Sequence, residues 1–86
     1  MDSDVERRLV LSSLVGRDAS RAVLLGALRS TGRIRSDVEK RLVLMRVPVA
    51  RLEDDDVSGA YMDATRTIRS DVERSLVLRH LARSGR

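Results

Sequence analysis

The fold is decided by the nine residues Ser36-Asp37-Val38-Glu39-Lys40-Arg41-Leu42-Val43-Leu44, because their pattern occurs three times in the 86-residue chain. The other copies occupy residues 3–11 and 70–78, at spacings of 33 and 34 residues. Ser-Asp-Val-Glu and Leu-Val-Leu are the same in all three copies. A period of this length holds two short helices and their turns. We therefore predict one helical-repeat domain over residues 1–86, with units at about 1–34 and 35–68 and a partial unit at 69–86.

Each copy opens with the pattern that starts a helix. A Ser at the N-cap and a Glu three residues later form a capping box, in which each side chain accepts the other residue's backbone N–H. The Asp between them places negative charge at the positive end of the helix dipole. Leu-Val-Leu then covers most of the helix circumference, which predicts burial on more than one side. The predicted boxes are Ser3/Glu6, Ser36/Glu39 and Ser70/Glu73.

The segments between the copies read as a second helix in each unit. Val57, Ala60, Tyr61, Ala64 and Ile68 form an apolar stripe at helical spacing, and their small members predict close approach of a neighbour. Pro48 marks a break before that helix. We expect an all-α fold in an A-B-A-B-A order, with five helices at about 3–15, 19–31, 36–46, 54–67 and 70–83.

Composition removes several classes of protein. The chain has no Cys, so a disulfide framework and a thiolate metal site are excluded. We expect no membrane span, because no run of 18 apolar residues occurs. The polar start of the chain predicts no signal peptide, and the composition does not indicate a cellular compartment. The net charge of +4 comes from 17 basic and 13 acidic residues mixed along the chain, which is typical of solvated helix faces.

Residues 34–40 and 68–74 resemble a bacterial tandem motif, Ile-x-Ser-Asp-x-Glu-Lys/Arg, which is followed by a Val/Leu run. Repeats of this kind are similar to HEAT-like α-solenoid units found within larger bacterial proteins. Short connections predict antiparallel neighbours in a right-handed or bundle-like stack. With the resemblance, the expected fold is a short right-handed α-solenoid of HEAT-like helix pairs, and the family has no catalytic residues to carry over. The first copy lacks the preceding Ile, which indicates a truncated array. Val replaces the usual aromatic after Ser-Asp in all three copies, which leaves a smaller core.

No constellation for catalysis or metal binding can be assembled. His80 is the only histidine, so we interpret it as a surface or interface residue. The acidic run at residues 53–56 lacks the alternating spacing and glycine of a calcium loop, and a helix start accounts for it better. The repeated Ser-Asp-x-Glu reads as a cap and not as three active sites. We expect no enzyme activity, no cofactor and no small-molecule substrate.

Basic residues recur at matching positions of the three copies, which predicts a row along one ridge that could bind an anion or nucleic acid. Glutamates stand beside them, and no aromatic side chain is interleaved for base stacking. Ion pairing between neighbouring repeats is therefore the favoured interpretation. The row consists of Arg7, Arg8, Lys40, Arg41 and Arg74.

The sequence favours a function in which this chain binds another protein or another copy of itself. Helical repeats offer extended binding surfaces, so we expect a scaffold for protein–protein interaction that is one fragment of a longer array. The alternative is self-assembly as a homodimer, a higher oligomer or an open filament, because uncapped ends expose apolar surface. The predicted interface consists of Leu76, Val77, Leu78 and Leu81 in the last helix and Leu9, Leu11 and Leu14 in the first.

Overall fold

The computed structural model describes residues 3–84, and this range is helical with no strand. The expected five helices are confirmed there, with boundaries within a few residues of the predicted ones. A short 3₁₀ helix that the sequence did not reveal, η1, precedes the fourth. The elements are α1 (Asp4–Leu14), α2 (Arg21–Thr31), α3 (Asp37–Leu44), η1 (Val49–Glu53), α4 (Asp55–Arg66) and α5 (Asp71–Ala82).

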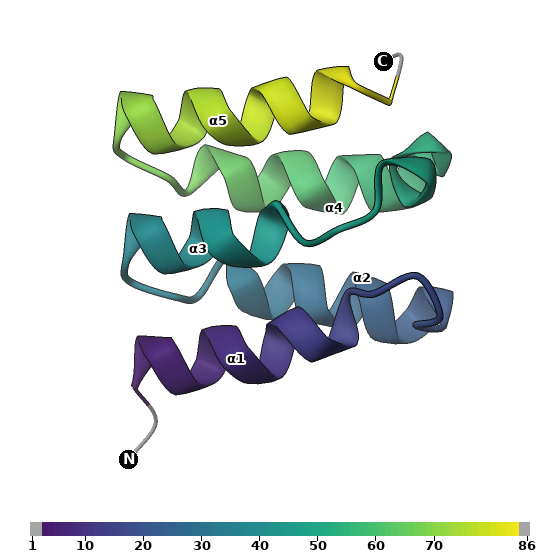
Figure 1. The fold of residues 1–86 in the computed structure, drawn as a ribbon, viewed down its shortest axis with the longest axis horizontal. Coiled ribbons are helices and arrows are strands. Elements are labelled where there is room, and N and C mark those ends of the chain that lie inside the picture. The colour runs from purple at the N-terminus through teal and green to yellow at the C-terminus, as the bar shows by residue number, and fades with distance from the viewer. Residues whose placement is uncertain (1–2, 85–86) are drawn as a thin grey trace.

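The helices lie in two layers. α1, α3 and α5 lie side by side in one layer, and α2 and α4 lie behind them in the other (Figure 1). α3 packs against both α1 and α5, while α2 packs against α4. The result is a flat body of 36 × 29 × 15 Å, in which α1 and α5 form opposite ends of the first layer.

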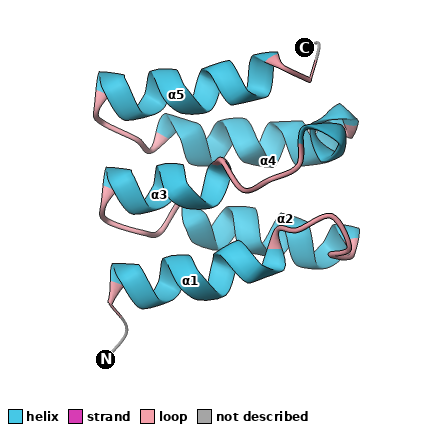
Figure 2. Cartoon of the chain, viewed as in Figure 1, coloured by secondary structure: helices cyan, strands magenta, loops and turns pink. Residues whose placement is uncertain are grey.

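Short connections join the helices (Figure 2), and polar caps fix where the helices start. A serine hydroxyl accepts the backbone N–H three residues on at the starts of α1, α2, α3 and α5, while the Asp54 carboxylate does the same for α4. Each such cap stabilises its helix by about 1 kcal/mol. The predicted serine hydroxyl bonds of the three repeated segments are therefore present.

The core lies between the two layers and is aliphatic except for Tyr61. Ile34 and Ile68, in the turns before α3 and α5, are both buried. The Tyr61 hydroxyl donates to the carbonyl oxygen of Leu44 at 3.0 Å, which satisfies the one polar group of this large buried side chain. Burial raises the pKa of Tyr61 well above its usual value, so the phenol stays protonated and remains a donor.

Candidate functional site

The starts of α1, α3 and α5 are bonded to one another along the stack. The Ser36 backbone N–H donates to Asp4 Oδ2 at 3.0 Å, and the Ser70 N–H donates to Asp37 Oδ2 at 2.8 Å. The Arg69 N–H also donates to Asp37 Oδ2, at 3.1 Å. The bond from the Ser70 N–H is the main reason that the pKa of Asp37 is lowered.

These bonds show that the glutamate half of the predicted capping boxes was wrong for α3 and α5. The sequence predicted that Glu39 and Glu73 would accept the N–H of the serine in their own helix, but that N–H goes to the aspartate of the preceding helix. The glutamates instead bind arginines of the preceding helix. Arg8 Nε lies 3.3 Å from Glu39 Oε1, and Arg41 pairs with Glu73 in the same way. The capping signature therefore also links α1 to α3 and α3 to α5.

The predicted row of basic side chains is largely engaged within the protein. Arg8 and Arg41 are held in the ion pairs just described. Lys40 is buried, and its Nζ donates to the Thr67 carbonyl oxygen at the end of α4, at 3.0 Å. Arg74 binds Asp71 and the Ile68 carbonyl oxygen. Arg7 is the one member of the row whose side chain has neither an ion pair nor a hydrogen bond to another residue in the described range, so the five do not form a free cationic ridge.

A separate basic hollow of about 760 Å³ lies at the turns before α3 and α5. Arg35, Arg66 and Arg69 line it together with Lys40, but the Asp37 carboxylate lies among them. Arg66 is also paired with Asp63 at 3.0 Å. The carboxylates offset much of the positive charge, so this hollow is a weak candidate for an anion site.

The predicted interface residues divide between core and surface. Leu11 and Val77 are buried in the core, so the prediction that they lie at an interface is wrong. Leu76 and Leu81 are half-buried, and Leu78 is exposed at 38%. On α1, Leu9 is exposed at 55%, Leu14 at 38% and their neighbour Val10 at 60%. Exposed apolar side chains are therefore more numerous on α1 than on α5.

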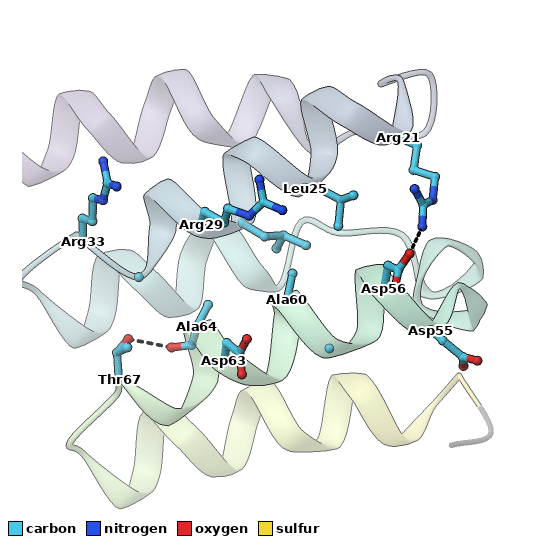
Figure 3. A pocket seen from close by; sticks show the side chains of 13 residues that line it. Arg21, Leu25, Arg29, Arg33, Asp55, Asp56, Ala60, Asp63, Ala64 and Thr67 are labelled. Atoms are coloured by element: carbon cyan, nitrogen blue, oxygen red, sulfur yellow. Dashed lines mark hydrogen bonds and ion pairs between the residues drawn. The ribbon is translucent and has the colours of Figure 1, made fainter.

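A groove of about 900 Å³ runs between α2 and α4 (Figure 3). Its floor is small or apolar and includes Leu25, Gly59 and Ala60. Arg29 and Arg33 stand on the α2 side, and neither forms an ion pair with a described residue. The α4 side is acidic. The groove thus has walls of opposite charge above an apolar floor, and its acidic members are Asp55, Asp56 and Asp63.

Arg21 closes one end of this groove. Its Nε lies 2.7 Å from Asp54 Oδ2, and its Nη2 is paired with Asp56 Oδ2. The guanidinium lowers the pKa of Asp54 to about 2, and the same carboxylate accepts the Asp56 N–H at 2.9 Å at the start of α4. Arg21 thereby ties α2 to the cap of α4 and leaves the rest of the groove open (Figure 3).

Sequence reasoning missed the groove, although a signal for it was present. Arg21 and Arg29 lie 34 residues before Asp55 and Asp63, so the sign of the charge reverses at the repeat period. Helices that pack side by side at that period then face each other with opposite charges. The small residues Ala60 and Ala64, which predicted close approach of a neighbour, line the groove.

The remaining candidate groups have structural partners. His80 Nε2 is hydrogen-bonded to the Val47 carbonyl oxygen at 2.6 Å, and its ring stacks on Tyr61 with centroids 6.4 Å apart. In the acidic run, Asp54 caps α4. Among residues 3–84, no group of three or more His, Asp or Glu side chains is placed to hold a metal ion. None of the helices in the described range combines the length and apolarity needed to cross a membrane.

The chain matches no family model, no curated protein and no solved structure. Its function is therefore argued from the linked helix starts, the groove and the exposed face of α1.

Proposed function

We propose that this chain is a non-catalytic helical-repeat scaffold whose α2–α4 groove holds a segment of another protein. The observation that carries the proposal is the groove itself, with an apolar floor, two free arginines on one wall and aspartates on the other. Apolar floors provide burial, while charges along the rim select the partner and its direction. The occupant is an extended peptide segment that bears both an acidic and a basic side chain.

We also propose that the helix pairs are units of a right-handed α-solenoid of the HEAT-like type. Two features support this. Successive helices alternate between the two layers, with α1, α3 and α5 in one and α2 and α4 in the other. The N-terminal turns of neighbouring helices in the first layer are also bonded to each other, through pairs of residues 31 to 33 apart in sequence. Solenoids present grooves between neighbouring helices of one layer as binding surfaces. The α2–α4 groove is a surface of that kind.

Gly59 gives a sharp test, because a Cβ built there meets no atom within 4 Å. We expect the larger side chain of a tryptophan at this position to extend into the groove, and Gly59→Ala is the matched control that adds only the Cβ. Random dodecapeptides displayed on phage are selected for binding to the whole chain. The affinity of each selected peptide is then measured for the parent chain and for both variants. We expect the selected peptides to bind Gly59→Trp at least about tenfold more weakly, or about 1.4 kcal/mol, and to bind Gly59→Ala unchanged.

The outcome of the selection decides the proposal. Circular dichroism first establishes that both variants keep the helical content of the parent chain. If no peptide is enriched, or if enriched peptides bind the Trp variant as well as the parent, the groove is not the binding site and the proposal fails.

Self-assembly is a second candidate, favoured by the exposed apolar side chains of α1. Leu9 and Val10 are both more than half exposed and lie on one helix, where a soluble monomer usually carries scattered apolar residues. Size-exclusion chromatography with light scattering measures the mass in solution. A monomer at high micromolar concentration removes this candidate.

A further inference from the structure

The α1–α2 end of the protein carries the residues of an interior face. Val43 and Val77, at matching positions of α3 and α5, are both 0% exposed, whereas Val10 in α1 is 60% exposed. α3 packs against α1 and α2, and α5 packs against α3 and α4, whereas no described helix precedes α1. Two further positions behave in the same way: Leu14 and Val23 are exposed, while Val47 and Val57, 33 and 34 residues later, are buried.

A polar group of this end likewise lacks the partner that its counterparts in α3 and α5 have. Glu39 receives Arg8 and Glu73 receives Arg41, each from the preceding helix of the layer. Glu6 holds the corresponding position in α1, is exposed, and forms no ion pair with another described residue. The α1–α2 end therefore offers both the apolar surface and the carboxylate that a preceding unit would bind.

The opposite end lacks the complementary groups. Ser75 occupies the position in α5 that Arg8 and Arg41 occupy in α1 and α3. Asp71, the counterpart of Asp4, is bound by Arg74 of its own helix. A second copy stacked head to tail would thus leave Glu6 without an arginine.

The apolar contacts would be weaker at that end as well. Leu24 is buried and Leu25 is half-buried in α2, but Ser58 and Gly59 stand at the corresponding positions of α4, 34 residues later. The surface that a head-to-tail copy would meet has therefore lost both the ion-pair donor and part of the apolar area that join the units inside the protein.

We propose that the α1–α2 end docks the terminal helix pair of a helical-repeat partner of this same type. That pair presents an aspartate at its first helical position and an arginine four residues later, as Asp4 and Arg8 are placed in α1. Its arginine pairs with Glu6, its aspartate accepts the N–H of Ser3, and its apolar face covers Val10 and Val23. This surface is separate from the α2–α4 groove.

A tandem protein tests the docking, in which residues 1–34 are followed directly by residues 2–86. This junction keeps the 33-residue spacing that separates the first two copies of the motif. The added unit supplies Asp4 and Arg8 to the inner α1. We expect a higher urea midpoint than that of the original chain, because repeat units stabilise each other through their shared interface.

Two valines of the inner α1 provide the matched variants. Val10→Asp places a charge in the proposed interface, whereas Val5→Asp alters a position that stays exposed in all three copies, at 50% for Val5, 47% for Val38 and 69% for Val72. We expect Val10→Asp to bring the tandem protein back to the midpoint of the original chain, and Val5→Asp to leave the gain in place. In the original chain both substitutions lie on the surface and shift the midpoint little.

Three results overturn the proposal. The first is a tandem protein that unfolds at the same midpoint as the original chain, and the second is an equal lowering of its midpoint by Val5→Asp and Val10→Asp. The third is a homodimer of the original chain that Val10→Asp dissociates, because a second copy would then cover this face. None of these results involves Gly59, so they are distinct from a failure of the groove.

Discussion

The three matching valines allow the order of the stack to be tested by substitution with alanine. Val43 and Val77 are fully buried, and Val10 is 60% exposed, although all three lie between two leucines in the same motif. Removing two buried methyl groups costs about 1.6 kcal/mol in transfer free energy. The remaining cavity adds up to about 1 kcal/mol, and the better helix propensity of alanine returns about 0.5 kcal/mol. We expect Val43→Ala and Val77→Ala each to lower the free energy of unfolding by about 2 kcal/mol.

Val10→Ala is the control, because it removes the same atoms from a surface position. It loses little burial and gains the helix propensity of alanine, so we expect no loss or a gain of up to about 0.5 kcal/mol. Urea unfolding followed by far-ultraviolet circular dichroism measures all three variants. With a slope near 1 kcal/mol per molar, the buried variants shift the midpoint by about 2 M. If Val10→Ala lowers the midpoint as much as Val43→Ala does, the two valines share an environment and the stacking order described above is wrong.

Three further substitutions probe single contacts. Tyr61→Phe removes the hydrogen bond to the Leu44 carbonyl oxygen and should cost about 1 kcal/mol in urea unfolding; an unchanged midpoint would show that the bond adds nothing. Asp37→Asn tests the bond from the Ser70 N–H. Because the pKa of Asp37 is lowered on folding, its charge stabilises the protein above the ordinary value of 3.8, and this advantage over the variant should vanish as the pH falls below it. A difference between the two proteins that does not depend on pH contradicts this. Gly26→Ala should raise the thermal midpoint, since a Cβ there meets nothing within 4 Å and alanine favours the helix by about 1 kcal/mol; a lower midpoint would reveal a clash.

The helix starts could be predicted from sequence because a cap is a local interaction. Ser36 and the backbone N–H of Glu39 are three residues apart, and their bond depends only on the conformation of that turn. The partner of the Ser36 N–H could not be predicted in the same way. Two acceptors were available to it, Glu39 in its own helix and Asp4 in the preceding one, and only the packing of α1 against α3 decides for Asp4.

The burial of residues in the repeated motif could not be predicted from their sequence neighbours either. Val10 and Val77 have nearly the same neighbours in sequence, yet one is exposed and the other is fully buried. We attribute the difference to the position of the helix in its layer: α5 follows α3 and packs against it, whereas no described helix precedes α1. A prediction that treated both ends as equally uncapped therefore assigned Val77 to a surface.

The choice of Arg8 as the partner of Glu39 has an electrostatic reason. Both side chains are mostly shielded from solvent, with 24% and 11% of their surface exposed. Pairing compensates the loss of water around both charges, and the Ser36 N–H that Glu39 does not accept is bonded by Asp4 instead. Ser-Asp-x-Glu thus serves two helices at once: its serine hydroxyl starts its own helix, and its carboxylates join the neighbours. Ser75 stands in α5 where Arg8 and Arg41 stand in α1 and α3, so the arginine that joins one helix to the next is present in the first two copies of the motif and absent from the third.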